Sequence, residues 1–405
     1  MPSIRGARRT FRRIWAGGLA ATLLLAGALV APPGARAQAK KEILIGCALP
    51  MTGAFSAFGR YYVDVYKFWE EEVNAKGGLL GSKVRLIMYD DKSDGSTAVS
   101  LYHKLITVDK VDLLVGGFTI PVLAVMPVAE KYKMLFVQGG TNATSIINKG
   151  NYKYTVTTLT TDQMWSDSLF EWLATIPADQ RPKRAAFVQQ VNPFLQGIVA
   201  HSTPKAKPLG IEVMTVETYA SDTQDFTAML QKFKASGVDM VFGANNYPAG
   251  LSFIRTMAET QYQPKLVFMA VGPTVPEWSK DLGARTDWVF TTTPYWHSLK
   301  GGGNERFVKA IEAKLGYTPP RDTGQGYTPL QVLQQAVEAT KSLNQDTLRE
   351  YIGSHTFETV SGTMKFDAQG YGAARNYLMQ IQKGKQTLVF PPEVKTSDPV
   401  YPRPQ

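Results

Sequence analysis

Short apolar runs alternate with segments of helical periodicity along most of this chain, and this alternation restricts the folds open to it. The runs typical of buried strands cover residues 43–49, 84–89, 112–115, 134–137, 185–189, 213–218, 240–242, 266–269 and 288–291. Apolar residues recur at helical spacing between them, as in the sets Tyr62, Tyr66, Trp69, Val73 and Ala98, Leu101, Leu105, Val108. Such alternation predicts an α/β fold with mainly parallel sheets, right-handed crossovers and helices on both sheet faces.

The length of the chain predicts more than one domain. At 405 residues with 44% hydrophobic and 19% charged residues, it is a folded globular chain too long for one ordinary domain. Two extended, threonine-rich runs at 156–161 and 290–294 indicate places where the chain passes from one lobe to another. We therefore expect two lobes.

The first 37 residues have the composition of a secretory signal. They hold six arginines and no acidic residue, an apolar segment at 14–30 and a small-x-small cleavage site at Ala35-Arg36-Ala37. The run Arg8-Arg9-Thr10-Phe11-Arg12 is similar to a twin-arginine export motif, with Arg12 in place of an apolar residue, so both the twin-arginine and the general secretory route stay open. An uncleaved membrane anchor is the alternative, but the apolar segment is short and Pro32-Pro33-Gly34 follows it. We expect cleavage after Ala37 and a periplasmic mature protein.

Charge and cysteine usage exclude several functions. The net charge of +10 is concentrated in the first 37 residues, and the rest of the chain is nearly balanced, with no basic patch of the kind that binds nucleic acid. The single cysteine, Cys47, excludes an internal disulfide. Leu44-Ile45-Gly46-Cys47 imitates a lipoprotein box, but charged residues separate it from the apolar segment, so we interpret Cys47 as a buried strand residue.

No catalytic constellation is visible in the sequence. The four histidines have no metal-ligand spacing, and neither a Gly-x-Ser-x-Gly elbow nor a Walker A loop occurs. Asp90, Asp91 and Asp94 can be interpreted as a metal cluster, but without further ligands a solvated loop whose Asp94 caps the next helix is the simpler interpretation. We expect no enzyme, no metal and no cofactor.

The stretch from residue 43 to 91 resembles a known family. A strand leads into Pro50-Met51-Thr52-Gly53, a helix ends at Asn74-Ala75-Lys76-Gly77-Gly78, and a second strand ends in Asp90-Asp91. This order is similar to the mature start of the Leu/Ile/Val-type periplasmic solute-binding proteins of ABC importers. The resemblance extends over about residues 42–385.

The resemblance implies a two-lobe periplasmic-binding-protein fold of type I with a hinge of three crossover segments. Lobe 1 is then residues 40–160 plus 292–365, and lobe 2 is residues 161–291 plus 366–390. The third crossing falls near residues 362–372. Residues 391–405 form a proline-rich tail that we expect to lie loosely against the surface.

Loops that join strands to helices in lobe 1 are the first candidates for ligand contact, since open α/β sheets bind ligands at the carboxyl ends of their strands. The first loop supplies Phe55, Ser56 and Phe58. In the resembled family the next two loops hold the ligand carboxylate through hydroxyl and main-chain N–H groups. By position this role passes to Phe118, Thr119, Gly140, Thr141 and Asn142, although Thr119 and Asn142 also fit simple helix caps.

Lobe 2 supplies the candidates for ligand contact from the other side of the cleft. Trp165 follows the first crossing, Phe194 occupies a place where the family often has an aromatic residue, and Asn246-Tyr247 matches a family segment ending Tyr-Pro. Core or hinge packing is the alternative for Trp165 and Tyr247.

One departure from the family restricts the chemical class of solute that we expect. Amino-acid binders place an acidic residue after the strand at 266–269 to pair with the ligand ammonium, but here Gly272 lies in that segment and the first acid is Glu277. A desolvated ammonium without a counter-charge is costly. We therefore favour an aromatic carboxylate, with an amide or urea-type solute next, over an aliphatic amino acid.

These observations together predict a monomeric periplasmic solute-binding component of an ABC importer. It would bind a small-molecule solute by hinge closure and deliver it to the permease subunits in the membrane. A sensory module of the same fold is the alternative, and a secreted enzyme is the third.

Overall fold

The computed structural model describes residues 42–117, 119–140, 143–148, 150, 152–372 and 375–404, without the side chains of 119–121 and 147. The expected signal segment 1–37 and the candidate residues Phe118, Thr141 and Asn142 lie outside this description, as does the side chain of Thr119. Within the described ranges, no helix has the length and apolarity needed to cross a membrane.

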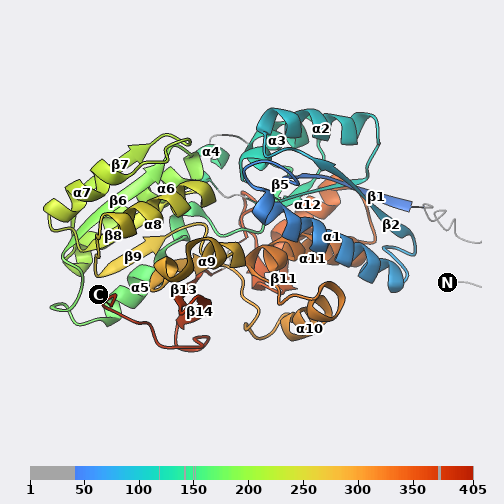
Figure 1. Ribbon diagram of the computed structural model, residues 1–405. Coiled ribbons are helices and arrows are strands. Elements are labelled where there is room, and N and C mark those ends of the chain that lie inside the picture. The colour runs from blue at the N-terminus through green and yellow to red at the C-terminus, as the bar shows by residue number, and fades with distance from the viewer. Residues whose placement is uncertain are drawn as a thin grey trace, which may run out of the picture. The chain divides into compact units, whose positions relative to one another are not determined.

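A five-stranded parallel sheet forms the core of lobe 1 (Figure 1), in the order β2-β1-β3-β4-β5. Its strands are β1 (Glu42–Leu49), β2 (Lys83–Asp90), β3 (Leu113–Gly116), β4 (Phe136–Gln138) and β5 (Thr155–Thr157). Side chains of β1 alternate between two clusters, Ile45 and Cys47 facing one and Ala48 the other. Helices α2 (Gly95–Thr107) and α3 (Thr119–Tyr132) cover the Ala48 face, and α1 (Ser56–Ala75) and α11 (Arg321–Thr340) cover the opposite face.

A seven-stranded sheet forms lobe 2, in the order β14-β13-β10-β9-β8-β6-β7. The five strands from β10 to β7 are parallel, and β13 and β14 add to the edge in antiparallel pairs. The strands are β6 (Arg184–Gln190), β7 (Glu212–Tyr219), β8 (Met240–Ala244), β9 (Leu266–Met269), β10 (Val289–Thr293), β13 (Tyr377–Gln382) and β14 (Lys385–Phe390). The flanking helices are α5 (Asp167–Thr175), α6 (Pro193–Ala206), α7 (Thr227–Ala235), α8 (Tyr247–Glu259) and α9 (Pro276–Leu282).

The chain passes between the two sheets three times, as the two-lobe fold with a three-segment hinge requires. The first passage follows β5 and reaches the 3₁₀ turn η1 (Asp162–Met164). The second follows β10 and leads to α10 (Asn304–Leu315), α11, α12 (Gln345–Ser354) and the hairpin β11 (Thr356–Thr359) and β12 (Gly362–Lys365); the third joins β12 to β13. The predicted α/β class with mainly parallel sheets is confirmed. Residue 292, the predicted start of the second segment of lobe 1, lies inside strand β10 (Val289–Thr293) of the lobe 2 sheet.

Local predictions from the sequence have mixed outcomes. Cys47 is fully buried in β1, and the Asp94 side chain accepts a hydrogen bond from the Thr97 N–H at the start of α2, as expected. Val108 was expected on the buried face of α2 but is 68% exposed, because the helix ends at Thr107 and Tyr102 fills the core instead.

The proline-rich tail is held firmly, so the expectation that it lies loosely is wrong for residues 391–404. Gln380 in β13 exchanges two hydrogen bonds with the backbone of Val400, at 2.8 Å each. The ring of Tyr401 packs edge-on against Trp172, and the Arg403 N–H donates to the Lys265 carbonyl oxygen. Side-chain and backbone contacts therefore fix a segment whose composition alone indicates looseness.

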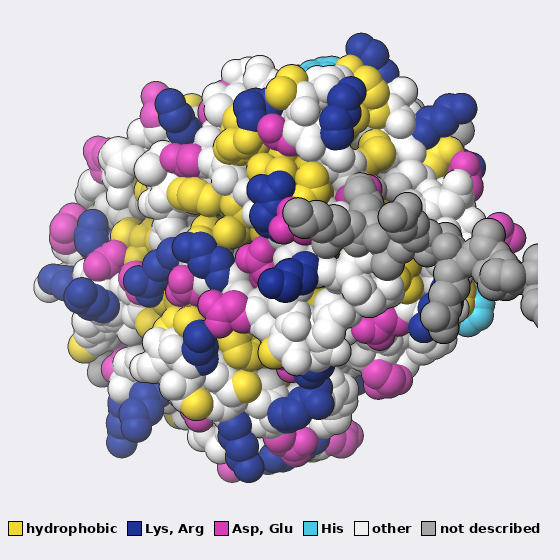
Figure 2. All heavy atoms as spheres, turned by 90° about the vertical axis from the view of Figure 1, so that its right-hand side faces the viewer, with side chains coloured by type: hydrophobic (Ala, Val, Ile, Leu, Met, Phe, Trp, Pro, Cys, Tyr) yellow, Lys and Arg dark blue, Asp and Glu magenta, His cyan; other side chains and the backbone are white. Residues whose placement is uncertain are grey.

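Charges on the surface are mixed. Figure 2 shows lysine and arginine side chains interspersed with aspartate and glutamate over the face it presents, with no patch of one sign. Most ion pairs in the described residues are exposed ones of this kind, such as Arg375–Glu171. The pair Arg321–Asp322 is different, because both side chains are buried.

Candidate ligand site between the lobes

Several segments of lobe 1 contact the side chain of Tyr62 at the candidate site. Tyr62 lies in the second turn of α1 and is fully buried, and burial raises its pKa well above the usual value. Its hydroxyl donates to the Gly139 carbonyl oxygen (3.2 Å), and Gln325 of α11 donates to the same oxygen. Gly117 packs so closely that a Cβ there would lie 2.6 Å from the Tyr62 ring. Helix α1, the loops after β3 and β4 and the start of α11 therefore meet around one side chain.

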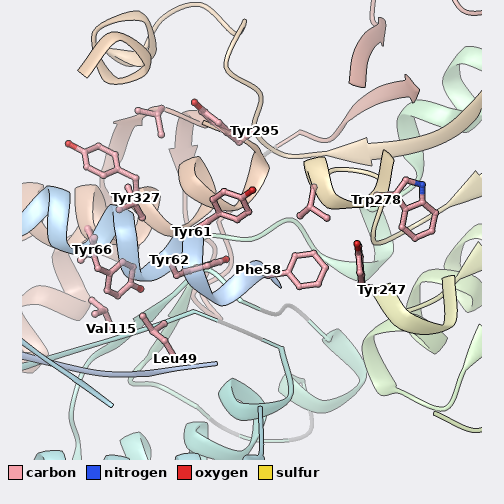
Figure 3. Close-up of a cluster of buried hydrophobic side chains, with 14 of the residues drawn as sticks. Leu49, Phe58, Tyr61, Tyr62, Tyr66, Val115, Tyr247, Trp278, Tyr295 and Tyr327 are labelled. Atoms are coloured by element: carbon pink, nitrogen blue, oxygen red, sulfur yellow. The ribbon is translucent and has the colours of Figure 1, made fainter. Parts of the chain in front are cut away.

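Phe58 extends this group toward lobe 2. It is 1% exposed, and its ring packs edge-on against Tyr247 of α8, with ring centroids 5.8 Å apart. Tyr247 in turn packs edge-on against Trp278 of α9 at 5.9 Å. Figure 3 shows Phe58 between Tyr62 and Tyr247, with Trp278 beyond. These side chains belong to one buried cluster that continues from lobe 1 into lobe 2.

A second contact between the lobes is ionic. Arg60 of α1 forms a salt bridge with Glu277 in the first turn of α9, and Glu277 is also within hydrogen-bond distance of the Tyr61 hydroxyl (3.4 Å). The guanidinium of Arg60 also lies over the Tyr61 ring. Burial raises the pKa of Tyr61 to about 12, so its hydroxyl stays protonated at neutral pH. The Glu277 carboxylate is therefore committed to lobe 1 side chains.

A buried ion pair lies beside Phe58. Arg321 and Asp322 open helix α11, with side chains 3% and 0% exposed, and Arg321 Nη2 donates to Asp322 Oδ1 at 2.8 Å. The Arg321 guanidinium lies over the Phe58 ring, 5.6 Å from its centroid. Burial raises the pKa of Asp322, although the guanidinium beside it acts in the opposite direction.

Among the other described candidates of lobe 1, Phe55 and Gly140 form hydrogen bonds within and between the loops through their backbone N–H groups. Phe55 occupies the position before α1 and Ser56 is its first residue, both half-buried. The Phe55 N–H donates to Ser93 Oγ (3.0 Å), which ties this loop to the one after β2. The Gly140 N–H donates to Gln138 Oε1 (2.7 Å), within the loop that touches Tyr62.

Two of the lobe 2 candidates, Trp165 and Phe194, pack in the core of that lobe. Their rings meet edge-on at 5.2 Å, and the Trp165 indole N–H donates to the Ala270 carbonyl oxygen at 3.1 Å. Thr292 and Asn376, beside the second and third crossings, both donate to the Trp165 carbonyl oxygen. These contacts favour the hinge-packing interpretation of Trp165.

Asn246 and Tyr247 divide the roles proposed for their segment. Asn246 caps α8, and its Oδ1 accepts from the Ala249 N–H at 3.0 Å. Tyr247 follows with its ring at the contact between the lobes and its hydroxyl donating to Asp281 Oδ2 at 2.7 Å. Among the described candidates, Tyr247 of lobe 2 meets Phe58 of lobe 1.

The structure gives a physical reason for glycine at position 272. Gly272 has φ = +112°, a conformation that side chains rarely adopt, and a Cβ there would lie 2.5 Å from the Trp278 ring. Trp278 itself is fully buried. The indole therefore fills the space that an acidic side chain at this position would need.

Arg321, Asp322 and Trp278 were not among the sequence candidates. The sequence carries a signal for a helix start at Pro319-Pro320, since proline favours the beginning of a helix. Nothing local indicates that the charges just after it are buried, because that depends on α1, which is far away in the sequence.

A cavity of about 970 Å³ lies where the first and third crossings meet the segment after β4, and Thr144 and Asn148 of that segment line it. It is lined by residues near the first crossing, such as Gln163, and near the third, such as Gln369. None of the described candidate residues lines it. Among the residues described, no three histidine, cysteine or acidic side chains are grouped to hold a metal ion.

Comparison with known proteins agrees with this architecture. The model of the periplasmic binding protein family matches residues 42–386. A relative from Brucella melitensis, named Leu/Ile/Val-binding protein homolog 7, is 24% identical over 94% of this chain and 97% of its own length.

Solved structures show the same fold. A leucine-binding protein from Thermotoga maritima superposes with a TM-score of 0.77 at 22% identity, covering 86% of this chain and 98% of its own. A solute-binding protein of an ABC transporter from Rhodopseudomonas palustris, in complex with 3,4-dihydroxybenzoic acid, superposes with a TM-score of 0.76 at 20% identity, covering 90% and 99%. The chain belongs to the periplasmic binding protein family.

Proposed function

We propose that this protein captures a small organic acid with an aromatic body between its two lobes and delivers it to the permease of an ABC importer. The observation that carries the proposal is the row Phe58, Tyr247 and Trp278, which continues from one lobe into the other beside a glycine at position 272. Aromatic side chains that converge with a few polar groups are typical of sites for apolar organic ligands.

The charges at this place support a ligand without an ammonium group. Glu277 is the first acid after β9, but its carboxylate is paired with Arg60. Two further acids lie nearby: Asp281 accepts from the Tyr247 hydroxyl, and the buried Asp322 is paired with Arg321. An ammonium group that displaced Arg321 from Asp322 would break a buried pair, which is costly and disfavours an aliphatic amino acid there.

The relatives point to both ligand classes. The leucine-binding protein and the Leu/Ile/Val-binding homologue support an amino acid, while the complex with 3,4-dihydroxybenzoic acid supports an aromatic acid. The crowding at Gly272 favours the second class for this chain, because an acidic side chain cannot be placed there without moving Trp278.

Hinge closure is the mechanism that this arrangement supports. In such a mechanism the solute binds one lobe and favours the population in which the other lobe has closed over it. The contacts of Phe58 with Tyr247 and of Arg60 with Glu277 join the lobes directly and would form on closure. We further propose that the signal at 1–37 exports the chain to the periplasm, where it works as a monomer and meets its permease transiently.

A thermal-shift screen with benzoate, 4-hydroxybenzoate, benzamide, urea, leucine and valine tests the proposal. A ligand that binds only the folded protein raises the melting temperature by mass action. We expect shifts with the aromatic acids. A shift with leucine or valine and none with the aromatic acids would contradict the proposed solute class.

Small-angle X-ray scattering with the solute that gives the largest shift tests the mechanism separately. We expect the radius of gyration to fall when the lobes close. A bound solute that leaves the scattering curve unchanged would contradict hinge closure.

A further inference from the structure

Arg321 is a buried arginine at the start of helix α11. It is 3% exposed, and its guanidinium lies over the ring of Phe58. Arginine is almost never fully buried unless it is paired and its N–H groups are satisfied. Its donors therefore need to be accounted for.

The described residues account for only part of its hydrogen-bonding capacity. Nη2 donates to Asp322 Oδ1, while the buried Nε finds no partner within the described ranges of the chain. The second carboxylate oxygen of Asp322, Oδ2, is also buried without a partner there. A guanidinium has five N–H donors in a fixed planar fork, so Asp322 leaves donors available for a second acceptor.

The surroundings of Arg321 are those of the proposed solute site. Phe58, on which its guanidinium rests, also contacts Tyr247 of lobe 2. Gln325, one turn further along α11, donates to the loop at Gly139. The acid that faces this group from lobe 2, Glu277, is paired with Arg60.

We propose that the Arg321 guanidinium binds the carboxylate of the solute, so that this residue selects for organic anions. This role rests on the proposed function and assigns the group that binds the charged end of the solute. A planar carboxylate matches the fork of a guanidinium with two parallel hydrogen bonds. The aromatic body of the solute would then lie against Phe58 and Tyr247.

Asp322 then has a positioning role. It holds the guanidinium in place before the solute arrives, because its Oδ1 accepts from Arg321 Nη2 at 2.8 Å.

Matched pairs of an acid and its amide test the proposal, with titration calorimetry as the measurement. The probes are benzoate with benzamide and leucine with leucinamide, which differ at the carboxylate alone. The wild-type protein is expected to prefer the acid of whichever pair it binds. In the double variant R321M/D322N, which removes both charges and keeps the volumes similar, the affinity for the acid should fall by about 10- to 150-fold, as for a lost charge-assisted hydrogen bond.

Two further variants keep the test falsifiable. D322N removes the competing charge but keeps an amide Oδ1 that can still accept from Arg321 and hold it in place, so it should bind the acid at least as tightly as the wild-type protein. R375M/E171Q removes an exposed arginine–glutamate pair in lobe 2 and should leave all affinities unchanged. Circular dichroism melts establish that each variant is folded.

The outcomes separate this inference from the proposed function. If the wild-type protein binds an acid and R321M/D322N binds it equally well, or if D322N loses acid binding as strongly as the double variant, the role of Arg321 is wrong while the proposed function stands. If the wild-type protein binds none of these probes or the solutes of the thermal-shift screen, the proposed function fails and the inference fails with it.

Discussion

The two walls that meet between the lobes differ in kind. The lobe 1 wall carries a buried charge pair, Arg321–Asp322, next to Phe58. The lobe 2 wall carries Tyr247 and Trp278, and Glu277 in the first turn of α9 is already paired across the junction. The comparison suggests that lobe 1 recognises the charge of a solute while lobe 2 supplies apolar cover.

The largest expected effect comes from breaking the charge pair of lobe 1. R321M leaves Asp322 buried without its partner, and such losses cost about 3–5 kcal/mol of unfolding free energy. Burial already raises the pKa of Asp322, and the loss of Arg321 removes the group that lowers it.

The pH dependence of R321M follows from that shift. A carboxyl whose folded pKa lies above its unfolded value of about 3.9 destabilises the fold as pH rises through the folded pKa. The stability deficit of R321M, measured by urea unfolding, should therefore shrink as pH is lowered from 7 toward 4. The exposed control R375M should cost less than about 1 kcal/mol at either pH. Equal stabilities of R321M and R375M would show that lobe 1 holds no critical charge.

Restoring an acid to the lobe 2 wall is expected to have the next largest effect. G272D requires a side chain at φ = +112° and within 2.5 Å of the Trp278 ring, so strain and overpacking together should cost about 3 kcal/mol or more. The control G384D, in the turn between β13 and β14, has positive φ but nothing within 4 Å of its Cβ. If G272D unfolds at the same urea concentration as G384D and also gains leucine binding, the space beside Trp278 does accommodate an acid. The structural reason given for the missing acid in the lobe 2 wall would then be wrong.

A smaller effect is expected from the ring that joins the two walls. F58L removes the aromatic contacts with Tyr247 and with the Arg321 guanidinium while it keeps an apolar side chain. Affinity for an aromatic acid should fall by about 2- to 12-fold in titration calorimetry, the range for one lost aromatic contact. F233L, in the core of lobe 2, should lower stability but not affinity. An affinity unchanged in F58L would remove Phe58 from the solute site.

The smallest effect belongs to the ionic contact at the rim. Arg60 is 54% exposed and Glu277 27%, so their pair contributes about 0.2–1 kcal/mol to lobe closure. R60Q should weaken solute binding by no more than about fivefold, and the difference from the wild-type protein should shrink in high salt because salt screens exposed charges. A loss above about tenfold would mean that Arg60, and not Arg321, reads the charge of the solute.

The features that sequence predicted well are those that local periodicity determines. The buried face of α1, the cap at Asp94 and the parallel strands all follow from spacing within a few residues. The expectation failed at Val108, where the helix ends one residue earlier than its apolar pattern, and in the tail, where contacts with Gln380 and Trp172 outweigh a loop-like composition.

The site was predictable only in part, because its walls are built from segments far apart in the chain. Phe58 and Tyr247 were found from their loops, and they do meet. Trp278 over Gly272, and Arg321 over Phe58, depend on long-range packing that no local pattern records. The sequence indicated that an acid was missing at Gly272, and the structure adds that an indole occupies its space.

A crystal structure with the aromatic acid that gives the largest thermal shift tests the central claim most directly. We predict that the carboxylate oxygens lie within hydrogen-bond distance of the Arg321 guanidinium and that the aromatic ring contacts Phe58 and Tyr247. A solute bound in the cavity beside the crossovers, or one whose carboxylate has no contact with Arg321, would contradict the account.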